Sequence, residues 1–170
     1  DMGKCIFITG GVRSGKSAFA EAYVKKYDLP AAYVATSEAF DQEMKERIER
    51  HQYDRLQQST KWQLYEMPYE LQAGISETIV LFECVTTWLA NMIFLKKHDN
   101  AVHIFKEWLM GLLQQEKTVI VVSNEVLDAG LTSYTETNTY LQTIGQLHVW
   151  LVQISEEAYE LDNRIIKQWK

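Results

Sequence analysis

The segment GGVRSGKS, residues 10–17, constrains this chain more than any other feature, because it fits the pattern G-x-x-x-x-G-K-[ST] without a mismatch. An apolar run at residues 5–9 leads into it, and a helical pattern at residues 16–28 leads out. A strand, a tight loop and a helix in this order direct several backbone N–H groups and the positive end of the helix dipole at one anion. A glycine-rich turn without a ligand is the alternative, but all three elements favour a phosphate-binding loop.

Each residue type in the loop suits this chemistry. Glycines let the backbone wrap closely around an anion. We expect Lys16 at the mouth of the loop, where it can reach the outer phosphates of a nucleotide, and the Ser17 hydroxyl can join the coordination of Mg²⁺. The predicted nucleotide contacts in the loop are Gly10, Gly11, Val12, Arg13, Ser14, Gly15, Lys16 and Ser17.

Short apolar runs alternate with longer helical patterns along the whole chain. Strands are expected at residues 5–9, 31–36, 62–66, 78–83, 118–123 and 158–161, and helices at 16–28, 41–55, 85–97, 101–117 and about 140–154. Most of these strands are continuously apolar, which is typical of strands buried on both faces. The pattern predicts an α/β fold in which helices flank a mainly parallel sheet, as a single domain over residues 1–170.

Composition narrows the classes of function. The net charge of −6 argues against nucleic-acid binding, so nucleotide phosphates must be held locally by backbone amides and a few cations. We find no signal-peptide pattern and no apolar run long enough to span a bilayer, and we expect a cytoplasmic protein. Cys5 and Cys84 lie inside apolar runs, which favours two buried thiols over a disulfide or a metal pair.

Polar residues end two of the predicted strands and should lie on the same rim as the loop. Glu83 is the candidate Mg²⁺ ligand, although an acid there could instead complement the dipole of the next helix. Thr36 and Ser37 could contact nucleotide or cap the helix that begins near Asp41.

The charged helix at residues 41–55 contains a candidate nucleophile. Met44, Ile48, His51 and Arg55 share one face, so His51 is expected on an inward stripe that fixes its ring. A core or capping histidine is the usual interpretation of such a position. The reactive alternative is a neutral imidazole that attacks phosphorus, with charge neutralised by Arg47, Arg50 and Arg55. These arginines could equally form i,i+4 pairs such as Glu43–Arg47 and Glu46–Arg50. His98, His103 and His148 lack metal-ligand spacing and are predicted to be structural.

Four segments occur in a specific order: GGVRSGKS, VATSEAFDQEMKERIERH, LFECVTTWLANM and VVSNEV. Together they resemble the bifunctional adenosylcobinamide kinase/adenosylcobinamide-phosphate guanylyltransferase family of cobalamin biosynthesis. The resemblance covers nearly the whole chain. It implies a P-loop NTPase fold of the RecA-like kind and a homotrimer. It also implies phosphorylation of a corrinoid hydroxyl by ATP or GTP, followed by transfer of GMP from GTP through a guanylylated histidine.

The resemblance also assigns site residues. The family's histidine matches His51, which with Lys16 is the implied catalytic pair. Further nucleotide contacts map onto Thr36, Ser37, Glu38, Gln52, Tyr53, Asp54, Arg55, Glu66 and Glu83, and Ser17 and Glu83 are the implied metal ligands.

Two segments depart from the family pattern. The last residues read DNRIIKQWK, where family members tend to have a glycine turn. Residues 127–142 lack the Gly/Pro turn and the arginine that usually follow SNEV, which predicts weakened corrinoid turnover. The residues alone leave two further hypotheses: a P-loop kinase for another small alcohol without a covalent histidine step, and a nucleotide-binding regulatory module without turnover.

Overall fold

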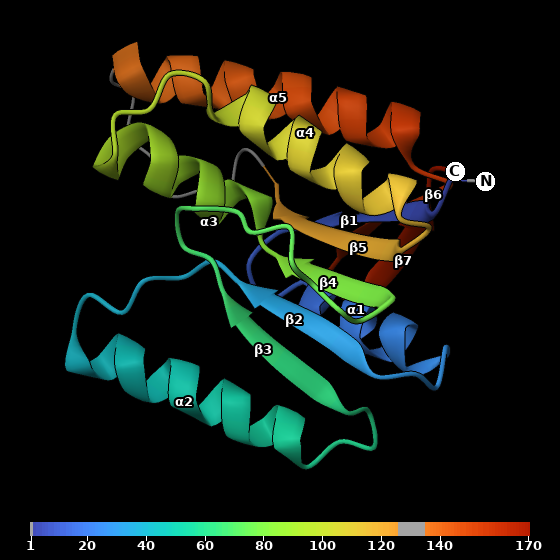
Figure 1. Ribbon diagram of the computed structural model, residues 1–170. Helices are drawn as coiled ribbons and strands as arrows, with labels where there is room; N and C mark the ends of the chain where they lie inside the picture. The colour runs from blue at the N-terminus through green and yellow to red at the C-terminus, as the bar shows by residue number, and fades with distance from the viewer. Residues whose placement is uncertain (1, 126–134) are drawn as a thin grey trace.

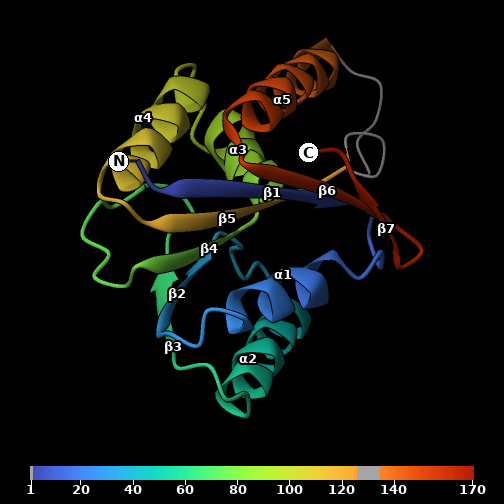
Figure 2. The ribbon, with the colours of Figure 1, turned by 90° about the vertical axis from the view of Figure 1, so that its right-hand side faces the viewer.

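A seven-stranded sheet forms the centre of the molecule, with helices on both faces (Figures 1 and 2). The structure is a computed structural model and describes residues 2–125 and 135–170. The strand order is β3-β2-β4-β5-β1-β6-β7, and every neighbouring pair is parallel except β6 and β7. The predicted mainly parallel α/β architecture is confirmed.

The strands are β1 (Lys4–Gly10), β2 (Ala31–Ala35), β3 (Trp62–Glu66), β4 (Ile79–Glu83), β5 (Thr118–Asn124), β6 (Glu157–Asp162) and β7 (Ile165–Gln168). The helices are α1 (Lys16–Lys25), α2 (Gln42–Leu56), α3 (Val85–Ala90), the π-helical turn η1 (Asn91–Leu95), α4 (Ala101–Gln114) and α5 (Thr135–Ile154).

Two layers of core explain why the central strands are continuously apolar. α3, α4 and α5 cover one face, where Phe82 and Trp88 are among the fully buried side chains. α1 covers the other face, where Ile8 and Leu81 are fully buried. A strand packed by helices on both sides has no solvent-facing row of residues, so its sequence does not alternate.

Three observed elements differ from those predicted. The helix expected at 85–97 is interrupted, because α3 passes into η1 at Asn91, whose Nδ2 donates to the carbonyls of Thr36 and Pro68. α1 ends at Lys25, earlier than expected. β7 was not predicted, because all four of its residues are exposed and its sequence carries no burial pattern.

Parallel strands bring their carboxyl ends to one edge of the sheet. The Cα register pairs Ala35 of β2 with Glu66 on one side and Glu83 on the other, and pairs Gly10 of β1 with Asn124 of β5. This edge is where open α/β sheets place their ligands.

Candidate nucleotide-binding and catalytic site

The loop between β1 and α1 has the tight geometry that its glycines predict. A Cβ atom at Gly10 would come within 2.4 Å of Ser14 Oγ and 2.9 Å of the Leu161 carbonyl oxygen. Gly15 has φ of 89°, a left-handed conformation that side chains disfavour, and directly precedes α1. Both glycines are therefore required by the path of the loop itself.

Lys16 lies inside the loop, contrary to the expected position at its mouth. Its side chain is 8% exposed, and Nζ donates to the carbonyl of Gly11 at 3.0 Å. The ammonium group thus reaches back across the loop to Gly11. Ser14 is also buried, and its Oγ has no hydrogen-bond partner among the described residues.

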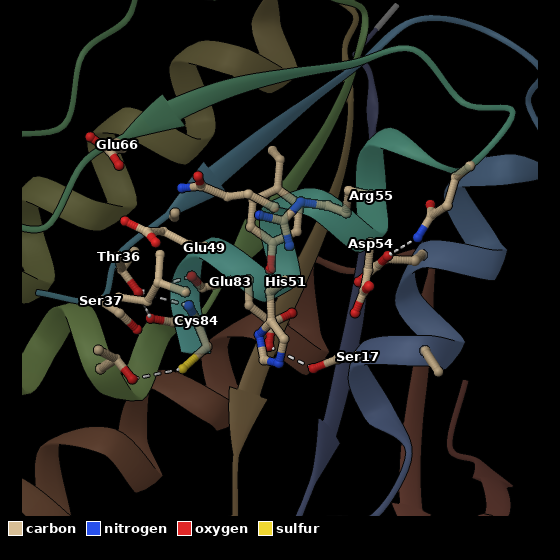
Figure 3. A pocket seen from close by; sticks show the side chains of 18 of the residues that line it. Ser17, Thr36, Ser37, Glu49, His51, Asp54, Arg55, Glu66, Glu83 and Cys84 are labelled. Atoms are coloured by element: carbon tan, nitrogen blue, oxygen red, sulfur yellow. Dashed lines mark hydrogen bonds between the residues drawn. The ribbon is translucent and has the colours of Figure 1, made fainter. Parts of the chain in front are cut away.

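The side chains of Ser17 and Glu83 meet where α1 begins and β4 ends. Ser17 Oγ donates to Glu83 Oε1 at 2.9 Å, the bond dashed in Figure 3. Glu83 Oε2 is buried without a partner among the described residues, and burial raises the pKa of this carboxyl. A buried carboxylate oxygen with no donor is a position that a cation would satisfy.

These residues border a pocket of about 1350 Å³ along the carboxyl edge of the sheet (Figure 3). The predicted site residues that line it are Ser17, Thr36, Ser37, Glu38, His51, Gln52, Asp54, Arg55, Glu66 and Glu83. Tyr53 is not among the lining residues, and its side chain is 62% exposed. Of residues 10–17, only Ser17 lines this pocket, so the loop segment meets the pocket at Ser17.

Thr36 is held in the rim of the pocket by hydrogen bonds. Its hydroxyl accepts a hydrogen bond from the Cys84 backbone N–H at 2.9 Å and lies within hydrogen-bonding distance of the carbonyls of Glu83 and Cys84. The alternative that Thr36 or Ser37 caps α2 is wrong, because Asp41 caps this helix through Oδ1, which accepts from the Met44 N–H at 2.7 Å. Thr36 instead ties the end of β2 to the end of β4 and so fixes Glu83.

His51 lies on the predicted face of α2, but that face borders the pocket and not a packed core. Met44 and Ile48 are only half-buried, and His51 is exposed to the pocket. The expectation that packing on this stripe holds the ring is therefore wrong. Periodicity identifies the inward face of a helix, and here the space inside that face is a ligand-sized cavity.

One of the three arginines expected around His51 lines the pocket. Arg55 is buried, and its guanidinium carbon stacks 3.6 Å from the centre of the Tyr33 ring. Arg47 instead pairs with Glu43 at 3.9 Å on the exposed side of α2, and Arg50 is not among the lining residues. The predicted pairing of Arg50 with Glu46 is not formed between these described residues, since Glu46 accepts from Gln42.

The pocket wall includes residues that the sequence analysis did not select. Glu21 and Lys25 follow Ser17 at intervals of four along α1, and Lys45 and Glu49 line it from α2. The spacing of Ser17, Glu21 and Lys25 is a signal that could have identified the α1 face.

The remaining histidines and cysteines are structural. His148 Nε2 lies 2.7 Å from Ser123 Oγ, and burial lowers the pKa of the ring to about 4. His103 pairs with Glu107 on the outer helix layer, and His98 Nδ1 accepts from a backbone N–H. Cys5 and Cys84 are free, buried thiols as predicted.

Among the described residues there is no cluster of three or more potential metal-ligating side chains, and no helix is long and apolar enough to cross a membrane.

The comparison with known families decides between the remaining hypotheses. The profile of the family described as "Cobinamide kinase / cobinamide phosphate guanyltransferase" matches residues 6–163. The chain belongs to this family. It is thus a bifunctional cobinamide kinase and guanylyltransferase of adenosylcobalamin biosynthesis, with corrinoid and nucleotide substrates.

Two relatives illustrate the extent of the similarity. The bifunctional adenosylcobalamin biosynthesis protein CobP of Pseudomonas aeruginosa is 31% identical over 157 residues, which cover 89% of this chain and 88% of the relative. The corresponding protein CobU of Escherichia coli is 39% identical over 92 residues, which cover 52% of this chain and 50% of the relative.

Two solved structures share the fold at low sequence identity. Flagellar accessory protein FlaH from Methanocaldococcus jannaschii aligns with a TM-score of 0.60 at 12% identity, covering 99% of this chain and 79% of FlaH. The KaiC-like protein PH0186 from Pyrococcus horikoshii aligns with a TM-score of 0.54, also at 12% identity, covering 99% and 80%. These similarities confirm the predicted RecA-like P-loop fold and carry no information on substrate.

Proposed function

We propose that both activities of the family use one shared pocket at the carboxyl edge of the sheet, with Ser17 at one end, Lys16 next to it in the loop, and His51 on the wall formed by α2. The observation that carries this proposal is that Ser17, Glu83 and His51, from three separate elements, border one continuous cavity. A cavity of about 1350 Å³ is larger than a typical small-molecule site of roughly 300–1,000 Å³ and can hold a nucleotide with part of a second substrate.

In the kinase reaction the phosphate loop holds the nucleoside triphosphate. Backbone N–H groups and the N-terminus of α1 face the phosphates, and Lys16 exchanges its bond to the Gly11 carbonyl for a phosphate oxygen. The corrinoid hydroxyl attacks the terminal phosphorus, and the bond from that phosphorus to the leaving diphosphate oxygen breaks. The hydroxyl proton leaves with solvent or a carboxylate of the pocket wall.

Ser17 and Glu83 are the residues that would hold Mg²⁺. The fit rests on the partnerless, buried Oε2 of Glu83 beside the Ser17 hydroxyl, because hydroxyl and carboxylate oxygens are ligands that Mg²⁺ prefers. Two protein ligands are sufficient, since Mg²⁺ usually keeps several waters and takes phosphate oxygens as further ligands. When bound, the ion would neutralise charge on the phosphates.

In the guanylyl-transfer reaction His51 is the proposed covalent carrier. A neutral ring nitrogen attacks the α-phosphorus of GTP, a P–N bond forms, and the bond to pyrophosphate breaks. The phosphate of the phosphorylated corrinoid then attacks the same phosphorus, and the P–N bond breaks as the histidine is released. Arg55 lies on the same wall and supplies a buried cation for the charge that develops on the α-phosphate.

The experiment is a pair of assays on one preparation. Adenosylcobinamide with ATP or GTP and Mg²⁺ should give the phosphorylated corrinoid, and further GTP should give the GDP-linked product, both resolved by mass spectrometry. Competition between the two half-reactions supports one shared pocket. If the kinase and guanylyl-transfer reactions can be saturated at the same time by separate nucleotide molecules, without inhibiting each other, the protein has two nucleotide sites.

Three expectations stay predictions. The homotrimer rests on the family resemblance alone. The weakened corrinoid turnover rests on residues 127–142, of which 127–134 lie outside the described residues. The nucleotide contact of Tyr53 is also unsupported by the lining of the pocket, so we expect Tyr53→Ala to change nucleotide affinity less than changes at Gln52 or Arg55.

A further inference from the structure

The unpredicted β6–β7 hairpin lies directly against the phosphate loop. β6 runs parallel to β1, and its Leu161 pairs with Gly10 at the start of the loop. The turn that follows donates a hydrogen bond from the Arg164 backbone N–H to the carbonyl of Ser14 at 3.0 Å. The hairpin therefore fixes the loop from the side opposite to β5.

This contact brings the side chain of Arg164 beside Gly15, the residue that directly precedes α1. The position of a Cβ at Gly15 would lie 3.4 Å from Arg164 Cγ. The Cγ atom of Arg164 thus lies beside Gly15, whose own N–H belongs to the phosphate loop, and the rest of the side chain extends from this point.

Arg164 is exposed, and no carboxylate among the described residues lies within ion-pair distance of it. Its backbone conformation is also unusual, because Asn163 and Arg164 have positive φ values of 47° and 66°. Glycine or asparagine is the ordinary choice at such a two-residue hairpin turn. An arginine there disfavours the turn, and among the described residues its guanidinium has no ion-pair partner that compensates for this.

We propose that Arg164 binds the phosphate chain of the nucleoside triphosphate, as a second cation beside Lys16. The proposal rests on the proposed function, in that residues 10–17 hold the nucleotide. A protein of net charge −6 gains from an additional local cation at this site. The planar guanidinium can donate two parallel hydrogen bonds to phosphate oxygens, which an ammonium group cannot do.

The test compares Arg164→Gln with Lys167→Gln. Glutamine keeps most of the stem of Arg164 and the same backbone strain, and it removes only the charge. Lys167 is the matched control, because it lies on β7 of the same hairpin with its Nζ over the Trp169 ring, 4.1 Å from the ring centre. Equilibrium binding of GTP, inorganic triphosphate and guanosine is measured for each variant of the full chain, at two or more salt concentrations.

We expect Arg164→Gln to weaken the binding of GTP and of inorganic triphosphate by a similar factor of about 10, and to leave the guanosine affinity unchanged. The affinity for GTP should also depend less steeply on salt concentration than in the wild type. Lys167→Gln should match the wild type, and Arg164→Lys should recover part of the loss. Wild-type affinity for GTP and triphosphate in Arg164→Gln would overturn the inference and leave the proposed function intact. An equal loss of guanosine affinity, or a loss in Arg164→Lys as large as in Arg164→Gln, would also overturn it. Failure of the wild type to bind GTP would instead remove the proposed function together with the inference.

Discussion

Ser17 Oγ and Glu83 Oε1 lie 2.9 Å apart although 66 positions separate them in the chain. The bond joins the first turn of α1 to the last residue of β4, so the phosphate loop and the neighbouring strand share one polar contact. The second carboxylate oxygen, Oε2, is buried without a partner among the described residues. This pair is the site that we propose for Mg²⁺.

Lys16→Ala should remove most nucleotide binding. We expect GTP affinity to fall by about 10- to 100-fold, because a charge-assisted hydrogen bond to phosphate contributes roughly 1.5–3 kcal/mol. The measurement is equilibrium titration with GTP, accompanied by thermal unfolding in the absence of nucleotide. Because Lys16 is buried and bonded to Gly11, we also expect a modest fall in melting temperature. Affinity like that of the parent would show that residues 10–17 do not hold the phosphates.

Glu83→Gln should stabilise the metal-free protein while impairing activity. Burial raises the pKa of Glu83 above that of the unfolded chain, so the folded state binds more protons and its stability falls as pH rises through this range. At neutral pH and in EDTA the variant should therefore melt at a higher temperature than the wild type. The difference should vanish below the pKa of the unfolded glutamate.

The same variant should need more Mg²⁺ for turnover, with nucleotide affinity in the absence of Mg²⁺ little changed. Rates titrated against Mg²⁺ for both proteins test this. If the variant and the wild type require the same Mg²⁺ concentration, Glu83 does not bind the ion and only complements the dipole at the start of α3.

His51 should carry GMP during turnover. Intact-mass measurement after incubation with GTP and Mg²⁺ should show one guanylyl adduct, and peptide mapping should place it within residues 47–55. The P–N bond of the adduct should be acid-labile and stable in base.

His51→Asn should abolish the adduct and leave the kinase reaction active. His103→Asn is the matched control, because this exposed histidine lies on α4 and is not among the residues that line the pocket. α4 lies on the opposite face of the sheet from α1 (Figure 2). An adduct that persists in His51→Asn, or none in the wild type, would remove the covalent-histidine step from the proposed mechanism.

His148 should make the protein sensitive to mild acid. Burial lowers its folded pKa to about 4, so its contribution to stability is present above the unfolded value and is lost as pH falls from about 6.5 towards 4. The loss would reach about 3 kcal/mol for a fully buried ring and is smaller here because the ring is half-buried. Denaturant unfolding at several pH values should show a flatter profile for His148→Gln, which keeps a partner for Ser123. Identical profiles would mean that other groups cause the acid sensitivity.

Local sequence was sufficient to determine the strand–loop–helix unit around residues 10–17. Its glycines, lysine and serine have roles that depend on the backbone of one short segment, and the continuously apolar strands indicate a parallel sheet from burial alone. The position of Glu83 also followed from the sequence, since the end of a parallel strand has only one edge of the sheet to occupy.

Tertiary structure decided what those residues face. The stripe of Met44, Ile48 and His51 is the same whether a core or a cavity lies inside it, and only the placement of α2 shows that the space is a pocket. The approach of Arg164 to Gly15 could not be predicted either, because β7 has no burial pattern and 149 positions separate the two residues. Helical periodicity and local motifs report on neighbours along the chain, whereas the charge and space around a phosphate depend on contacts between distant segments.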